Sequence, residues 1–206
     1  MTTHHHRNAP AQAFLLLHGW QNRRPAGHWQ HWLTRELRAL GLEAHHPQLP
    51  DPDHPDPGAW TDTITGILHG SHRAWTVICH SLSCVAWLHL CMRPIRPVER
   101  LLFVAPPSIT FLATTPELRE FVPPSASFDR IAATSLSRPR LACSDRDPYC
   151  EPPAHEIYPD AFDVDVVPRG GHLDMGTGLG PWPELLDWCR RPETRIGCRS
   201  ALAART

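Results

Sequence analysis

The sequence predicts an α/β fold in which a mostly parallel sheet of about six strands carries helices on both faces. Three observations support this class. Short apolar runs alternate with helical patterns about six times, turn residues separate them, and no internal repeat interrupts the order. The 206 residues correspond to one domain, and 41% of them are hydrophobic, which is enough to build a substantial core.

The first half of the chain alternates three strands with two helices. The expected strands are short apolar runs at 13–17, 42–46 and 75–79. Residues 29–40 are expected to be helical, because Trp and Leu recur there at helical spacing and Gly41 follows as a suitable end. A second helix over residues 60–68 follows a segment rich in Pro and Asp, residues 47–57, which is expected to be a surface loop.

The second half continues the alternation and ends in a helix. Strands are expected at 101–105, 140–143 and 162–167, and helices at 83–92 and 183–189. Residues 106–138 are mixed, with several Pro and Ser, and are expected to form a short cap or a loop over a site. The chain therefore divides into a flexible N-terminal segment (1–11), an α/β domain (12–190) and a loose C-terminal tail (191–206).

Charge and composition exclude several classes of function. The 20 basic and 21 acidic residues give a net charge of −1, which does not favour a nucleic acid or an anionic membrane as partner. All basic residues are Arg, so a lysine nucleophile or Schiff base is excluded. No apolar run approaches the roughly 18 residues that a membrane span needs. The N-terminus lacks a secretory pattern, so a cytoplasmic protein is expected.

The spacing of cysteine and histidine does not indicate a metal site. The seven Cys include no C-x-x-C pair, which argues against a disulfide framework and against a cysteine zinc site. The 15 His include no H-E-x-x-H motif, and the adjacent His45 and His46 would face opposite sides of a strand. Nucleotide-binding glycine motifs are also missing, so no metal and no cofactor are expected.

Ser81 lies between a buried strand and an apolar helix. In a nucleophile elbow, such a serine sits on a tight strand-to-helix turn that lifts its hydroxyl above the sheet edge. The usual G-x-S-x-G pattern has small residues two positions before and after the serine, where this chain has Cys79 and Ser83. Taken alone, such a match is more often an ordinary helix N-cap serine than a nucleophile.

Two further polar residues follow later strands in the order that serine chemistry requires. A serine hydroxyl is a weak nucleophile unless an oriented base lies beside it. Asp147 comes just after the strand expected at 140–143, and His172 follows the strand expected at 162–167. Because the carboxyl ends of parallel strands meet at one edge of a sheet, we expect Ser81, Asp147 and His172 to lie together as nucleophile, acid and base.

The loop after the first strand, His18-Gly19-Trp20, is the expected second half of an oxyanion hole. A tetrahedral intermediate needs two N–H donors aimed at its developing negative charge. We expect one donor to be the N–H of Leu82, the residue after the nucleophile, and the other to be the N–H of Trp20. Gly19 would allow the backbone turn between them.

Six stretches of the chain, taken in order, resemble the small serine hydrolases grouped with retinoblastoma-binding protein nine and the bacterial YdeN proteins. The stretches are LLLHGWQNRRPAGHWQHW (15–32), HPDPGAW (54–60), VICHSLSCVA (77–86), LLFVAPPS (101–108), CSDRDPYC (143–150) and GGHLDMGTGLGPWPE (170–184). The resemblance spans about residues 13–188 and implies an α/β-hydrolase fold with a minimal lid or none. It also implies a small-molecule acyl substrate and esterase-like or peptidase-like activity, with Asp147 rather than Asp145 as the acid.

The chain departs from this family at the elbow, and the departure keeps other functions open. Cys79 stands where the family has Gly or Ala, and Ser83 stands where it has Gly. A side chain at position 83 would push the helix away from the strand and shift the Leu82 N–H, and misplacement by ~1 Å costs ~100-fold in rate. An inactive binding or scaffold protein with this fold therefore remains an alternative, as does an acyltransferase that uses the same site.

Overall fold

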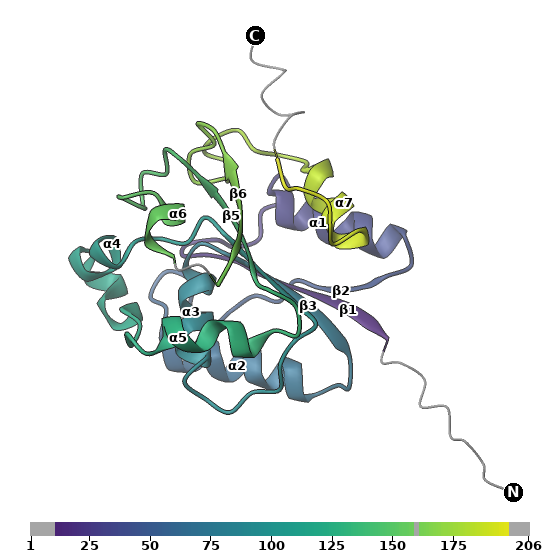
Figure 1. Cartoon of the computed structure of the whole chain (residues 1–206), viewed down its shortest axis with the longest axis horizontal. Helices are drawn as coiled ribbons and strands as arrows, with labels where there is room; N and C mark the ends of the chain where they lie inside the picture. The colour runs from purple at the N-terminus through teal and green to yellow at the C-terminus, as the bar shows by residue number, and fades with distance from the viewer. Residues whose placement is uncertain (1–10, 159–160, 198–206) are drawn as a thin grey trace, which may run out of the picture.

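Within the residues that the computed structural model describes, 11–158 and 161–197, the central sheet has six parallel strands in the order β2-β1-β3-β4-β5-β6 (Figure 1). The strands are β1 (Gln12–Leu17), β2 (Glu43–His45), β3 (Ala74–His80), β4 (Arg100–Val104), β5 (Arg140–Ser144) and β6 (Asp163–Val167). Each strand lies within one residue, at either end, of the strand expected from the sequence. The expected α/β class with a parallel sheet is confirmed.

The strand order creates a crevice beside β1 and β3. β2 lies on one side of β1, whereas β3 and every later strand of this sheet lie on the other side. The chain therefore reverses its direction of travel across the sheet between β1 and β3. Loops leaving the carboxyl ends of these two strands diverge at this reversal, which is where open α/β sheets bind ligands.

Helices cover both faces of the sheet (Figure 1). One face carries α1 (Trp29–Ala39) and α7 (Pro183–Arg190), and the other carries α2 (Pro57–His69), α3 (Leu82–Leu90) and α5 (Ser127–Arg130). Along β1, Phe14 and Leu16 join the core beneath α1 and α7, whereas Leu15 and Leu17 join the core beneath α2 and α3. All four side chains are fully buried, as the alternation of a two-sided strand requires.

Local signals determine where the two long helices begin and end. Helix α2 starts at Pro57, earlier than the expected range, because Asp56 caps it by accepting a hydrogen bond from Ala59 N at 2.6 Å. Proline fits this first helical position because its missing N–H would have no acceptor there. Helix α1 ends just before Gly41, whose φ of +76° suits glycine better than any other residue.

Residues 106–138, expected to be a cap or a loop, form a small helical cap. It contains α4 (Ile109–Thr114), the 3₁₀ helix η1 (Pro116–Phe121), α5 and the 3₁₀ helix η2 (Ile131–Thr134), and α6 (Ala154–Ile157) follows after β5. Leu118 and Phe121 are buried in the core beneath α2 and α3. The ring of Phe121 lies edge-on to Trp60, with centroids 5.4 Å apart. The cap is therefore anchored to the domain by apolar packing.

Residues 191–197, expected to begin a loose tail, pack against β6 instead. Asp165 on β6 is 3% exposed, accepts a hydrogen bond from Ile196 N at 3.2 Å, and forms ion pairs with Arg140 at 3.0 Å and Arg195 at 2.7 Å. A buried carboxylate requires such partners because its desolvation is costly. Ile196 is itself buried. The folded part of the chain therefore extends past the expected boundary at Arg191, because no local pattern of residues marks Asp165 as the partner of this segment.

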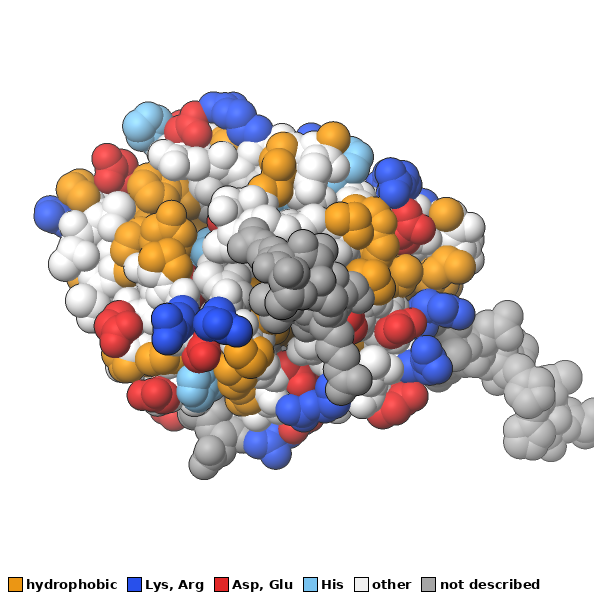
Figure 2. Space-filling view, turned by 90° about the horizontal axis from the view of Figure 1, so that it is seen from above, with side chains coloured by type: hydrophobic (Ala, Val, Ile, Leu, Met, Phe, Trp, Pro, Cys, Tyr) orange, Lys and Arg blue, Asp and Glu red, His pale blue; other side chains and the backbone are white. Residues whose placement is uncertain are grey.

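The remaining residues of the two expected terminal segments, 1–10 and 198–206, lie outside the described residues. In the described part of the chain, no helix is both long and apolar enough to cross a membrane. The same residues contain no group of three or more His, Cys, Asp or Glu side chains arranged to hold a metal ion. On the face seen in Figure 2, acidic and basic side chains are interspersed, in keeping with the net charge of −1.

Candidate active site

The turn between β3 and α3 has the backbone geometry of a nucleophile elbow. Ser81 lies there with φ 57° and ψ −123°, a conformation that residues other than glycine rarely adopt. Its N–H donates to Val104 O on the neighbouring strand at 2.9 Å, and its carbonyl accepts from Cys84 N at 2.9 Å in the first turn of α3. These bonds hold the strained residue at the carboxyl end of the sheet, with its side chain partly exposed.

Ser83, at the elbow position where the resemblance has glycine, is accommodated by hydrogen bonds. Its Oγ accepts from His80 N at 2.9 Å and lies 2.9 Å from both Leu17 O and His80 O, either of which accepts its single proton. Cys79 points into the core that contains α2 and α3, where burial raises the pKa of its thiol well above the usual value. Ser83 thus links the ends of β1 and β3 to the start of α3.

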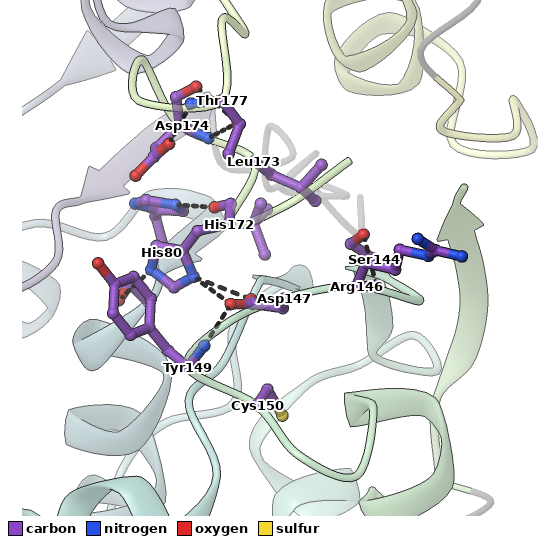
Figure 3. Close-up of polar contacts among 12 residues, drawn as sticks. His80, Ser144, Arg146, Asp147, Tyr149, Cys150, His172, Leu173, Asp174 and Thr177 are labelled. Atoms are coloured by element: carbon purple, nitrogen blue, oxygen red, sulfur yellow. Dashed lines mark hydrogen bonds and ion pairs between the residues drawn. The ribbon is translucent and has the colours of Figure 1, made fainter. Parts of the chain in front are cut away.

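Ser81, Asp147 and His172 lie in one hydrogen-bonded line, of which Figure 3 shows the imidazole and the carboxylate. Ser81 Oγ is 2.8 Å from His172 Nε2, and His172 Nδ1 is 2.8 Å from Asp147 Oδ2 and 3.0 Å from Oδ1. A carboxylate only accepts, so Nδ1 carries the ring proton and Nε2 of the neutral ring accepts the hydroxyl proton of Ser81. Asp147 and His172 are both buried, which limits competition from water.

Asp147, and not Asp145, faces the imidazole. Asp145 is exposed, and its Oδ1 accepts from the backbone N–H of Arg169. Asp147 Oδ1 accepts a second hydrogen bond, from Tyr149 N at 2.9 Å, which fixes the carboxylate plane (Figure 3). The Tyr149 ring stands edge-on to His172 at 4.6 Å between centroids, and both residues line the cavity.

The loop that carries His172 has an unusual backbone that two side chains hold in place. Gly171 has φ +57° and Leu173 has φ +50°, so a left-handed residue lies on each side of His172. For a leucine this conformation costs ~1–2 kcal/mol. His80 Nε2 lies 3.2 Å from the carbonyl of His172, and Trp29 Nε1 donates to the carbonyl of Leu173 at 2.8 Å.

Gly19 brings the loop after β1 into contact with the elbow. A Cβ added at Gly19 would lie 2.7 Å from Ser81 Cβ and 3.1 Å from Ser81 Oγ, so a side chain there has no room. Trp20 and Leu82 both line the cavity beside Ser81. Leu82 is the first residue of α3, so its N–H has no acceptor within the helix.

His18 determines which way the peptide between Gly19 and Trp20 faces. Leu49 N donates to His18 Nε2 at 2.8 Å, so the ring proton of the neutral imidazole is on Nδ1, which donates to Gly19 O at 2.8 Å. The C=O and N–H of a trans peptide point in opposite directions. Because Gly19 O faces His18, the Trp20 N–H faces away from it.

A cavity of about 490 Å³ opens above Ser81 and has two kinds of wall. The apolar part comes from the start of α3 and from the helical cap, namely Leu82, Pro107, Phe111 and Leu118. The polar part comes from the loop after β1 and from the loop after His172, namely Gln21, Asn22, Arg23 and Asp174. This volume lies within the range of ~300–1,000 Å³ that is typical of small-molecule sites.

The histidines around the site differ in their electrostatics from ordinary surface histidines. Burial lowers the pKa of His18 to about 4, and it also lowers the pKa of His28 to about 4 despite the nearby carboxylate of Asp174. Burial lowers the pKa of His80 well below its usual value. These three rings are therefore neutral at neutral pH, and each presents one donor and one acceptor.

Sequence reasoning missed His28, His80 and Tyr149, which surround the predicted residues. Each lies within one of the recognised stretches, and two lie close to a predicted site residue: His80 precedes Ser81, and Tyr149 follows Asp147 by two positions. Their position in these stretches was the signal that could have identified them as part of the site. The contacts of His28 were not predictable, because Ser81 and His28 lie on different loops that only the sheet order brings together.

The comparison with known proteins agrees with this fold. The sequence model of the family described as "Serine hydrolase" matches residues 14–191. YdeN of Bacillus subtilis (strain 168), whose name calls it a hydrolase, is 26% identical over 186 residues, covering 84% of this chain and 91% of YdeN. These matches confirm the expected resemblance to YdeN.

Solved structures show the same fold. The crystal structure of the ydeN gene product from B. subtilis superposes with a TM-score of 0.72 at 22% identity and covers 87% of this chain and 97% of its own. The esterase domain of a Rhodothermus marinus protein gives a TM-score of 0.61 at 15% identity, covering 90% of this chain and 89% of its own. With the family model matched over residues 14–191, the chain belongs to the serine hydrolase family.

Proposed function

We propose that the protein hydrolyses a small ester, thioester or amide through an acyl-serine intermediate. In this proposal Ser81 is the nucleophile, His172 the general base and Asp147 the acid that orients it. The observation that carries the proposal is the hydrogen-bonded line from Ser81 Oγ through both ring nitrogens of His172 to Asp147, with 2.8 Å at each step. Membership of the serine hydrolase family supports it.

In the acylation step, His172 Nε2 takes the hydroxyl proton as Ser81 Oγ attacks the substrate carbonyl carbon. The tetrahedral intermediate collapses when the leaving group departs with the proton that His172 returns to it. A water molecule then attacks the acyl-serine ester and gives a proton to His172, which returns it to Ser81 Oγ as the bond to the acyl group breaks and the acid product leaves. Asp147 keeps the ring proton on Nδ1 and stabilises the imidazolium that forms in each half-reaction.

The N–H groups of Trp20 and Leu82 are the donors to the oxyanion in this proposal. The Leu82 N–H has no acceptor within α3 and lies at the positive end of the helix dipole. The Trp20 N–H faces away from His18, and the contact of Gly19 with Ser81 keeps it beside the reacting carbonyl. Loss of one such donor typically costs ~100–1,000-fold in kcat.

The cavity supports a small acyl substrate with an apolar part. Its volume of about 490 Å³ suits a ligand well below the size of a folded polypeptide. An acyl or alkyl group would pack against Leu82, Phe111 and Leu118, and a polar group would face Asn22 and Asp174. Short-chain p-nitrophenyl esters are therefore suitable first substrates.

The decisive experiment combines labelling with turnover. The wild-type protein should react with a fluorophosphonate probe at Ser81 and hydrolyse p-nitrophenyl acetate or butyrate. Ser81→Ala should lose labelling and at least ~1,000-fold in kcat. Ser83→Ala is the control for loss of a neighbouring hydroxyl, and it should still be labelled. Wild-type turnover by Ser81→Ala would show that the nucleophile assignment is wrong.

The same experiment separates the two alternatives. If the folded wild-type protein is not labelled, the hydroxyl is not activated and a binding or scaffold role replaces catalysis. If added alcohol or amine intercepts the acyl-serine in preference to water, the protein is an acyltransferase. Product analysis by mass spectrometry, with and without the added nucleophile, distinguishes this outcome from hydrolysis.

A further inference from the structure

Two buried histidines beside the hydrogen-bonded line each have one ring nitrogen without a partner. His80 ends β3, immediately before Ser81, and His28 precedes the first turn of α1. Both residues are 3% exposed. His80 Nδ1 and His28 Nε2 have no hydrogen-bond partner among the residues that the structure describes. Unpaired buried polar atoms are uncommon in proteins and call for a physical explanation.

The tautomer of each ring follows from the nitrogen that does have a partner. His80 Nε2 lies 3.2 Å from the carbonyl oxygen of His172, which only accepts, so Nε2 carries the proton and Nδ1 is an acceptor (Figure 3). His28 Nδ1 accepts a hydrogen bond from Gln30 N at 3.2 Å. In a neutral ring the proton of His28 is therefore on Nε2, which is a donor.

The unpaired donor of His28 and the unpaired acceptor of His80 are complementary, and the rings are neighbours. Their centroids are 5.3 Å apart at an interplanar angle of 61°, so the rings are adjacent, and a direct bond between the two unpaired nitrogens requires the rings to rotate from their present orientation. Trp29 packs edge-on to His80 at 5.5 Å and limits other orientations of the ring.

We propose that His28 and His80 are positioning residues for His172: two neutral imidazoles form a hydrogen-bonded relay from Gln30 N–H to the His172 carbonyl and hold the base over Ser81. His28 Nε2–H donates to His80 Nδ1, and His80 Nε2–H donates to His172 O. This inference rests on the proposed function, because it concerns the placement of the base in that reaction.

The backbone around His172 shows why such a relay is needed. The left-handed residues Gly171 and Leu173 flank the base, so the loop would relax to another conformation without external contacts. Trp29 holds the carbonyl of Leu173, and His80 holds the carbonyl of His172. Successive carbonyls of the base loop are thus anchored to α1 and to the elbow, which keeps Nε2 at its 2.8 Å distance from Ser81 Oγ.

The relay requires both rings to be neutral, and their surroundings keep them so. Burial dominates the lowered pKa of each, with smaller electrostatic contributions from His172 and His18 to both rings and from His28 to His80. Asp174 faces His28 and acts in the opposite direction, favouring its charged form, but burial outweighs it and the pKa of His28 is about 4. Protonation of either ring would replace an acceptor nitrogen with a donor and break the relay.

Three variants test the relay without removing the groups that react. His80→Leu removes the donor to His172 O, whereas His80→Gln offers an amide that both accepts and donates. His28→Asn keeps a side-chain oxygen that can cap α1, since Asn is a favoured N-cap residue, but it is too short to reach His80. His89→Leu is the matched control, because it removes an imidazole contact with a backbone carbonyl, Phe121 O at 3.1 Å, from a residue that does not line the cavity.

The expected result is a loss in kcat with little change in KM. His80→Leu should lower kcat by about 10–100-fold, as displacement of a base by a fraction of an ångström does, and His80→Gln should recover most of that loss. His28→Asn should lower kcat by ~3–10-fold, and the double variant His28→Asn/His80→Leu should be no slower than His80→Leu alone, because the two rings act as one unit. His89→Leu should keep kcat within about twofold.

An NMR measurement tests the relay independently of turnover. Two-bond ¹H–¹⁵N spectra of the imidazoles should show both His28 and His80 as Nε2–H tautomers, with the His28 Nε2–H protected from exchange. That protection should disappear in His80→Leu. A His28 proton on Nδ1, wild-type kcat in His80→Leu, or equal losses in the Leu and Gln variants would overturn the proposal. Fluorophosphonate labelling of the wild-type protein tests the proposed function separately, so that its failure is distinguishable from failure of the relay.

Discussion

Gly19 touches Ser81 so closely that a methyl group on Gly19 would meet Ser81 Cβ at 2.7 Å. We expect Gly19→Ala to lower kcat/KM by ~100-fold or more, because the loop that carries the Trp20 N–H must move away from the nucleophile. Gly66→Ala on α2 is the matched control, since a Cβ there meets no atom within 4 Å and alanine favours a helix. Ester hydrolysis by both variants provides the test, and normal activity of Gly19→Ala would contradict the close contact.

The acid of the site is tested by a pair of neighbouring aspartates. Asp147→Asn should lower kcat by ~1,000–10,000-fold, because an amide facing Nδ1 favours the wrong tautomer of His172. Asp145→Asn should retain activity within a few-fold, since Asp145 faces the backbone of Arg169 and not the imidazole. Steady-state kinetics of the two variants decides the assignment, and a larger loss in Asp145→Asn would reverse it.

The hydroxyl of Ser83 should matter more for stability than for chemistry. Ser83→Ala leaves the buried His80 N–H without its acceptor, so the free energy of unfolding should fall by ~1–3 kcal/mol. Thr114→Ala, which removes an exposed hydroxyl bonded to Thr110 O, should change it by less than ~0.5 kcal/mol. Urea denaturation monitored by tryptophan fluorescence compares the two. Equal stability of Ser83→Ala and the wild type would show that the hydrogen bonds at the elbow contribute nothing.

The protein should lose stability as the pH falls from about 6.5 to about 4. Burial lowers the pKa of His18 and His28 to about 4 and that of His46 to about 3, against 6.5 in the unfolded chain. In this window the unfolded state binds protons that the folded state does not, so acid favours unfolding, by up to about 1.4 kcal/mol per pH unit for each histidine. Above pH 6.5 all three are neutral in both states, and their contribution is constant.

Denaturation midpoints measured at pH 7, 6 and 5 test whether the free energy of unfolding falls with acid. His46→Gln has one fewer titrating group, so its free energy of unfolding should fall less steeply with acid than that of the wild type. If the free energy of unfolding changes equally with pH in the two proteins, His46 is protonated in the folded state as it is in the unfolded chain.

The sequence was sufficient to predict the strands and the order of the polar residues that follow them. Alternation of Phe14 and Leu16 with Leu15 and Leu17 reads directly as a strand buried on both faces, because side-chain direction alternates along any strand. The grouping of Ser81 with His172 follows from the parallel sheet, since all strands then end at one edge.

Other features depend on contacts between segments that are distant in sequence. The hydrogen bond from Ile196 N to Asp165 and the ring contact between Tyr149 and His172 have no local sequence pattern. The pairing of His28 with His80 likewise requires knowledge of which loops meet above the sheet. Short-range periodicity carries no such information, so the tail and the surroundings of the imidazole could not be predicted.

Ser83 has a consequence for how enzymes of this kind are found. A small side chain with a hydroxyl can take the place of the elbow glycine when strand ends offer it a donor and two acceptors, as His80 and Leu17 do here. Searches that demand glycine two positions after the nucleophile would pass over this chain and over any other built in the same way. A pattern that admits serine there, combined with a later Asp-Pro-Tyr and a Gly-His pair, would retrieve them.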